Sequence, residues 1–286
     1  MLNQIKHCLV FFSSILILSG CASIQEAESL FSKGDKEAAL EMAISLIKED
    51  DPKIRLRAVR LIGKIGGEKA GFALRQRIKD PDAKVQKEVV KGLGKIKYEP
   101  AMEDLVDLVP DADENMIRTL GGAFASYGKT GIDLLVERYE DPNESSDRQA
   151  FKQTLIKVGP VVAPSIIERM RGKSFFENRD SFDILQRVKN PETARHMLGY
   201  LKDEGVAEQV IEATSKLGSG AVNATIDALA SMDSKNENIR VREGLIRILG
   251  ELKDPRAVET LESLSQHKSE RIRDAVDRAL SKIRGF

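Results

Sequence analysis

Few side chains in this sequence have the type and spacing that chemistry requires. Its two cysteines, Cys8 and Cys21, both lie in the first 21 residues. Beyond that stretch the histidines are His196 and His267, which are 71 residues apart and have no adjacent glutamate. Neither Gly-x-Ser-x-Gly, a phosphate-binding loop nor Gly-x-Gly-x-x-Gly occurs. We therefore predict no catalytic residue, no metal site and no cofactor, and a protein that is not an enzyme.

The composition is that of a soluble chain with a packed core, because 31% of the residues are charged and 41% are hydrophobic. Tryptophan is absent and aromatic residues make up 5%, which disfavours a pocket that encloses a small ligand. The net charge is zero, which argues against a dedicated nucleic-acid-binding protein.

The first twenty residues have the layout of a secretory signal peptide. Lys6 supplies the positive charge, and residues 9–18 form a short apolar stretch that only Ser13 and Ser14 interrupt. This stretch is far shorter than the roughly 20 apolar residues that span a bilayer. We therefore predict that residues 1–20 are an export signal.

The sequence Leu18-Ser19-Gly20-Cys21 resembles the lipobox of bacterial lipoproteins. This resemblance implies cleavage before Cys21 and attachment of a diacylglycerol to its sulfur. It also implies that the chain is anchored in the bacterial cell envelope by its N-terminal lipid. Because no Asp follows Cys21, the periplasmic face of the outer membrane is favoured over the inner membrane.

A unit of about 31 residues repeats through the rest of the chain. Residues 51–66 resemble residues 82–97, and Asp51, Asp82 and Asp113 hold the same place, where each is expected to cap a helix. The last apolar position of each unit recurs at steps of 29 to 35 residues, at Ile65, Ile96, Tyr127, Val158, Val188, Leu217, Leu252 and Ile283.

Each unit divides into two helices. Apolar residues at helical spacing predict a second helix over residues 54–65, and the next unit begins with a first helix over residues 68–79. Gly66, Gly128 and Gly159 are expected just past helix ends. No stretch alternates with period two, so no sheet is predicted. A helical hairpin over residues 23–48 is expected to cap the array, since terminal repeats must cover exposed apolar surface.

Residues 51–66 read DPKIRLRAVRLIGKIG and resemble the short HEAT-like repeat, of the type also found in phycobilisome lyases. The resemblance implies an all-α fold, a right-handed α-solenoid of about eight helix pairs with an N-terminal capping hairpin. The predicted organisation is a signal peptide at 1–20, the lipidated N-terminus and hairpin at 21–50, and the solenoid at 51–286. The pattern is irregular over about 160–230.

Charge is arranged in blocks. Residues 53–97 contain 14 basic and 4 acidic residues, whereas residues 98–147 contain 3 basic and 13 acidic residues. In HEAT-like solenoids the second helices line the concave face, so the resemblance places part of the basic block there. This block would attract an acidic protein segment or anionic lipid headgroups. We name the predicted residues the basic stripe: Lys53, Arg57, Arg60, Lys64, Lys84, Lys91 and Lys95.

Two other interpretations of the charges stay open. The stripe could be neutralised by acidic residues across the repeat interface, or it could be an ordinary solvated helix face. A second set of arginines is assigned to one common place in the repeat, where Asp–Arg contacts between adjacent turns are expected. These are Arg55, Arg118, Arg148, Arg242 and Arg273.

The function predicted from these features is a lipid-anchored interaction scaffold or assembly factor that holds a protein partner on its concave face. A lyase-like or enzyme-accessory role is the alternative, and nucleic-acid binding is a third reading. The iron-binding HEAT-like hydroxylases use His-Glu pairs, which this chain lacks. Fold resemblance alone does not identify the partner.

Overall fold

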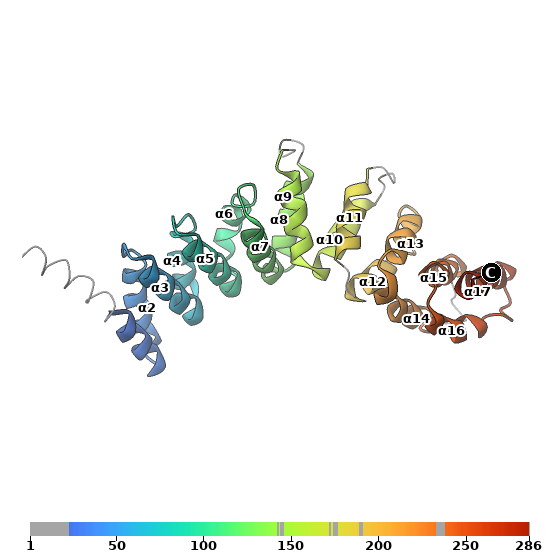
Figure 1. Ribbon diagram of the computed structural model, residues 1–286, viewed down its shortest axis with the longest axis horizontal. Coiled ribbons are helices and arrows are strands. Elements are labelled where there is room, and N and C mark those ends of the chain that lie inside the picture. The colour runs from blue at the N-terminus through green and yellow to red at the C-terminus, as the bar shows by residue number, and fades with distance from the viewer. Residues whose placement is uncertain are drawn as a thin grey trace, which may run out of the picture. The chain divides into compact units, whose positions relative to one another are not determined.

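The computed structural model describes residues 23–141, 143, 146–171, 173, 177–188, 191–232 and 238–285. These residues form α-helices and short 3-10 helices, and no strand occurs among them. Successive helices are arranged in pairs (Figure 1). The prediction of an all-α solenoid is confirmed.

The chain divides into two compact units, residues 1–127 and 128–286. In the first unit, residues 23–32 form a helix. The elements that follow are α2 (Lys36–Leu46), α3 (Pro52–Ile65), α4 (Glu68–Arg75), α5 (Ala83–Ile96), η1 (Glu99–Ala101), α6 (Met102–Val106) and α7 (Glu114–Tyr127).

The second unit continues the helix pairs. Its elements are α8 (Lys129–Glu140), α9 (Arg148–Val158), η3 (Pro160–Val162), α10 (Ala163–Met170), α11 (Arg179–Arg187), α12 (Pro191–Leu198), α13 (Ala207–Ser215), η4 (Gly218–Ala221), α14 (Val222–Ala230), α15 (Ile239–Leu252), η5 (Pro255–Ala257), α16 (Val258–Glu262) and α17 (Glu270–Arg284).

The predicted N-terminal hairpin is present. The helix at 23–32 and α2 are joined at Gly34, whose φ of 93° suits glycine, and the Asp35 carboxylate accepts the Ala38 N–H at 3.1 Å. Ile24 and Ala27 are fully buried. Helix α2 packs against α3, so the hairpin is continuous with the repeats of its unit.

Three aspartates cap the second helices of the first unit, as the sequence predicts. Asp51 accepts a backbone N–H of α3 at 2.8 Å, Asp82 accepts two from α5 at 2.9 and 3.0 Å, and Asp113 accepts one from α7 at 2.6 Å. Side-chain caps of this kind stabilise a helix by about 1 kcal/mol each. Gly66, Gly128 and Gly159 follow helix ends with φ of 74°, 69° and 87°, also as predicted.

In the irregular middle repeats, α11 and α13 have no side-chain cap. Asn178 precedes α11, but its side-chain nitrogen donates to the carbonyls of Met170 and Lys173, both at 3.1 Å, instead of capping the helix. Val206 precedes α13 and offers no polar side chain. The predicted helix ends are nevertheless close, since α11 ends at Arg187 and α13 at Ser215.

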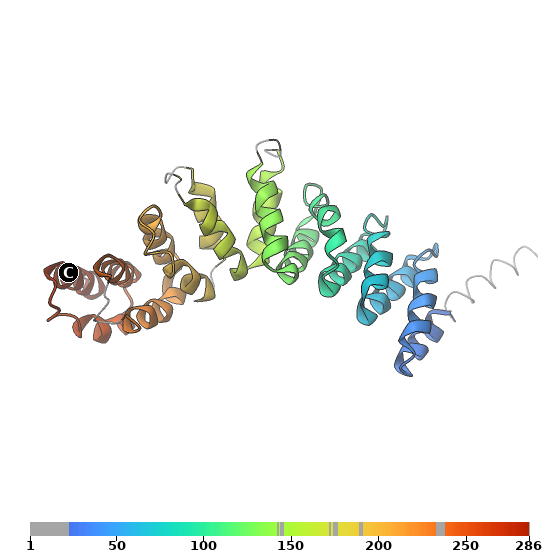
Figure 2. The same ribbon diagram turned by 180° about the vertical axis from the view of Figure 1, so that it is seen from behind.

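The second helices pack on one another in a continuous layer within each unit. In the first unit α3 packs on α5 and α5 on α7, and in the second unit α9, α11, α13, α15 and α17 follow in the same way. Helices α8, α10, α12 and α14 form a matching layer of first helices. Figure 2 shows the same pairs from behind. We call the exposed side of α3, α5 and α7 the second-helix face.

Small residues lie where neighbouring second helices approach most closely. A Cβ built on Gly94 of α5 would lie 2.7 Å from the Cα of Ala123 on α7. A Cβ built on Gly250 of α15 would likewise lie 2.9 Å from the Cα of Ala279 on α17. Because backbone cannot move aside as a flexible side chain can, these positions require glycine.

We expect Gly94→Ala to lower the free energy of unfolding by about 1–3 kcal/mol, because the added methyl group overpacks the α5–α7 contact. The matched control is Gly122→Ala in α7, where no atom lies within 4 Å of the added Cβ. That change should raise stability by about 0.5–1 kcal/mol through helix propensity. Urea unfolding followed by circular dichroism measures both. Equal effects at the two sites would contradict this account of the packing.

Candidate partner-binding groove

The basic stripe lies on neighbouring helices of the first unit, as predicted from its spacing. Lys53, Arg57, Arg60 and Lys64 are on α3, and Lys84, Lys91 and Lys95 are on α5. Arg57 is half-buried and the other six residues are exposed. Because α3 packs directly on α5, all seven belong to the second-helix face.

Two members of the stripe are neutralised by neighbouring carboxylates. The guanidinium of Arg57 donates to both carboxylate oxygens of Glu28, at 2.6 and 3.2 Å. Arg60 lies 3.5 Å from Glu88 of α5. Both pairs join adjacent helices of the layer. At these two arginines the structure therefore supports the interpretation that the stripe is neutralised by acidic residues across the repeat interface.

The five lysines of the stripe are different. In the described part of the chain, no carboxylate lies within 4.0 Å of the ammonium group of Lys53, Lys64, Lys84, Lys91 or Lys95. Much of the excess positive charge in residues 53–97 therefore lies on these lysines. Unpaired charges of one sign attract oppositely charged partners, and salt screens this attraction over about 10 Å at 0.1 M.

A groove of about 540 Å³ runs between α5 and α7. We call it the basic groove. No acidic side chain is among the residues that line it, and its floor is formed where Gly94 meets Ala123. The α5 wall consists of Lys87, Lys91, Gly94 and Lys95, and the α7 wall of Asn115, Arg118, Thr119, Gly122, Ala123 and Ser126.

The cations of the two walls differ in how they are paired. Arg118 contacts Glu114 of its own helix at 3.2 Å. Lys87 also borders a second hollow of about 460 Å³ that Asp107, Asp111 and Asp113 line, although none of these carboxylates lies within 4.0 Å of its ammonium group. The least compensated positive charge of the groove is therefore that of Lys91 and Lys95.

The sequence interpretation missed Lys87, Arg118 and the uncharged residues of the α7 wall. Two signals could have found them. Lysines 87, 91 and 95 follow one another at four-residue steps, so they share one side of a helix. The small uncharged residues at 115, 119, 122 and 126 also fall at helical spacing.

The second arginine set turns out to be structural at Arg55, one of its two buried members. Arg55 donates from Nε and Nη2 to the two carboxylate oxygens of Asp80, both at 3.0 Å, and from Nη1 to the carbonyls of Glu49 and Asp50. Burial opposes ionisation of Asp80, but hydrogen bonds from Arg55, Arg77 and the Asp82 amide outweigh it and lower its pKa. The predicted Asp–Arg contact is thus present here.

The other members differ from the prediction. Gln86, Arg242 and Arg273 occupy the place of Arg55 in α5, α15 and α17, four residues after the cap, and each donates to a carbonyl of the preceding segment, at 3.1, 3.3 and 2.8 Å. Arg118 follows its cap by five residues and Arg148 directly follows Asp147. Placing them in the same set was wrong, because a fixed step along the sequence ignores where each helix begins.

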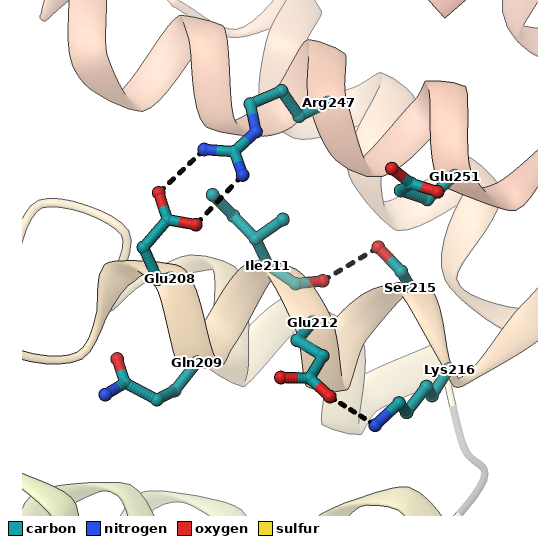
Figure 3. Close-up of a pocket in the computed structure, with 8 residues that line it drawn as sticks. All are labelled: Glu208, Gln209, Ile211, Glu212, Ser215, Lys216, Arg247 and Glu251. Carbon is teal, nitrogen blue, oxygen red and sulfur yellow. Dashed lines mark hydrogen bonds and ion pairs between the residues drawn. The ribbon is translucent and has the colours of Figure 1, made fainter. Parts of the chain in front are cut away.

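The groove between α13 and α15 in the second unit differs from the basic groove, because its charged side chains are paired with one another. It has about 520 Å³. Arg247 forms two hydrogen bonds with Glu208, at 2.7 and 2.9 Å, which lower the pKa of that carboxyl (Figure 3). Lys216 is paired with Glu212. The charged lining of this groove is therefore largely neutralised from within the chain.

The described residues contain no group of three or more His, Cys, Asp and Glu side chains that could hold a metal ion. The ring of His267 accepts the Ser269 N–H through Nδ1 at 3.1 Å, which is a local structural contact. The side chain of His196 is outside the described part of the structure. That the chain has no enzymatic activity stays a prediction.

The predicted signal peptide and Cys21 lie outside the described residues, so cleavage and lipidation stay predictions. In the part of the chain that the structure describes, no helix is both long enough and apolar enough to cross a membrane.

A family model for HEAT repeats matches residues 38–123, 73–156 and 226–285. No curated protein matches the sequence. Among solved structures, human deoxyhypusine hydroxylase in complex with glycerol is 19% identical, with 90% of this chain and 100% of that chain covered and a TM-score of 0.36. An engineered protein is 17% identical over 86% and 96% of the two chains, with a TM-score of 0.27. A chain of the SYS-1/POP-1 complex is 12% identical over 87% and 63%, with a TM-score of 0.35.

We expect Arg55→Ala to lower the free energy of unfolding by about 2–3 kcal/mol, because it removes both Arg55 hydrogen bonds from the buried Asp80 carboxylate and leaves only those from Arg77 and the Asp82 amide. Arg118→Ala serves as the matched control. Since the pair of Arg118 with Glu114 is exposed, its removal should change stability by less than about 0.5 kcal/mol. Urea unfolding at pH 7 measures both, and a large loss in the Arg118 variant would contradict the assignment.

Proposed function

The chain belongs to the HEAT-repeat family, and from that premise we propose that it is a scaffold that holds a protein partner on the second-helix face of its first unit. Helical repeats present a long surface to which successive units contribute equivalent positions. Such a surface suits binding of an extended partner.

The unpaired lysines of the basic groove carry this proposal. Many charges on the second helices have a partner in a neighbouring repeat, as Arg57 has in Glu28 and Lys282 has in Glu251. Lys91 and Lys95 have none among the described residues. An acidic protein surface would supply the missing negative charge and would be drawn to the groove by the same field.

We further propose that Cys21 carries a lipid and anchors the chain in a bacterial envelope, at the periplasmic face of the outer membrane. The support is the sequence Leu18-Ser19-Gly20-Cys21 after a short apolar stretch. Two or more acyl chains hold a protein on a membrane, whereas one chain binds marginally. The basic residues of α3 begin about thirty positions after this cysteine, so the groove would work close to the membrane.

Cys21→Ser should abolish labelling of the chain by radioactive palmitate in its native host and move the protein out of the membrane fraction. Cys8→Ser is the matched control, because Cys8 precedes the proposed cleavage site and should leave labelling unchanged. An unlabelled wild-type chain would contradict the lipoprotein assignment and leave the groove proposal untouched.

The paired change Lys91→Glu with Lys95→Glu should abolish crosslinking of the chain to its partner in intact cells. The control is Lys157→Glu with Lys216→Glu, since Lys157 and Lys216 also directly precede the last apolar residue of their repeats but lie outside the groove. Thermal unfolding should show that both variants stay folded. Equal crosslinking by the two variants would exclude the basic groove as the binding site.

A further inference from the structure

We propose that the basic groove binds an extended segment of the partner whose acidic side chains occur at alternate positions. This inference rests on the proposed scaffold function and specifies the chemistry of the bound segment. Its three parts are the spacing of the lysines, the character of the opposite wall and the width of the groove.

The lysines of α5 form a row with a regular spacing. Lys87, Lys91 and Lys95 are separated by four residues each, which is about 6 Å along a helix and about 12 Å from first to last. Alternate side chains of an extended chain lie on one side and are about 6.6 Å apart. Acidic residues at positions 1, 3 and 5 of an extended segment therefore match the three lysines in order.

The opposite wall can bind the main chain of such a segment. Asn115 is exposed and its side-chain amide makes no hydrogen bond among the described residues, so it can both donate and accept. Thr119 and Ser126 donate their hydroxyl hydrogens to carbonyls of their own helix, at 2.8 and 3.0 Å, which leaves the oxygens free to accept. These groups suit backbone amides, which an extended segment leaves unpaired.

The groove is narrow because its two helices approach closely. The contact between Gly94 and Ala123 brings the backbones of α5 and α7 together at the floor. Because the axes of packed neighbouring helices are only about 8–10 Å apart, the lysines of α5 and the polar groups of α7 are within reach of one extended chain lying between them. An extended segment can therefore contact both walls at once.

Carboxylates suit this groove better than phosphate groups do. Lysine meets carboxylate and phosphate alike as a point charge, so the preference comes from spacing: three lysines about 6 Å apart along the helix match separate single charges. The one arginine that lines the groove, Arg118, is engaged with Glu114. The row therefore favours a series of single carboxylates over a clustered phosphate charge, such as that of a lipid headgroup.

The test uses the full chain purified in detergent and two fluorescein-labelled peptides, followed by fluorescence anisotropy at low salt. One peptide has the sequence Gly-Ser-Asp-Ala-Asp-Ala-Asp-Ser-Gly, and the other, Gly-Ser-Ala-Asp-Asp-Asp-Ala-Ser-Gly, has the same composition with adjacent aspartates. We expect the alternating peptide to bind about threefold or more tightly, and Lys91→Gln to weaken it by about two- to fivefold. Lys157→Gln is the matched control and should leave binding unchanged.

Equal affinity for the two peptides would overturn the alternating register. Unchanged binding by Lys91→Gln would overturn the location in the basic groove. If the chain bound vesicles of phosphatidylglycerol through Lys91 and neither peptide competed, the occupant would be a lipid surface and the inference would be wrong. A further outcome separates this inference from the scaffold function. If reversal of Lys91 and Lys95 abolished partner crosslinking but neither peptide bound, the inference would be wrong and the scaffold function would stand.

Discussion

The structure depends on the close stacking of consecutive second helices. A single helix pair cannot bury its apolar side alone, so each repeat must pack on the next. The glycine at positions such as 94 and 250 lets the backbones meet without an intervening side chain. Because this contact recurs at one place in the repeat, it fixes the register of each helix against its neighbour and sets which exposed side chains face each other.

That register explains the ion pairs across the repeat boundaries. Pairs such as Arg57 with Glu28, Arg169 with Glu140 and Arg271 with Glu243 join residues 28 or 29 positions apart. Exposed pairs of this kind contribute about 0–1 kcal/mol each, so they do not hold the fold together. Their main consequence is electrostatic, since each neutralises a charge that the surface would otherwise present. The lysines of α5 keep their charge because α7 contributes no carboxylate to the lining of the groove that they share.

The sequence predicted most of the fold because the signals are local. Aspartate caps, helical spacing of apolar residues and glycines past helix ends are each contained within one helix, and Asp51, Asp82 and Asp113 were all found in this way. The candidate site was predicted only in part. Whether Arg60 is neutralised depends on Glu88 in the next repeat, and that partner can be identified only when the register of the two helices is known. Arg118 was misplaced for the same reason, since its place must be counted from Asp113.

The lysine row lowers the stability of the chain that carries it. Like charges four residues apart on a helix destabilise it by about 0.2–0.5 kcal/mol per pair, and Lys87, Lys91 and Lys95 make two such pairs. An acidic residue at position 122 or 126 of α7 would relieve this repulsion, as Glu88 does for Arg60, but these positions hold Gly122 and Ser126. The cost is small against the roughly 5–15 kcal/mol that stabilise a domain. A bound acidic segment would supply the negative charge that α7 lacks at these positions. Binding would therefore also relieve the repulsion between Lys87, Lys91 and Lys95.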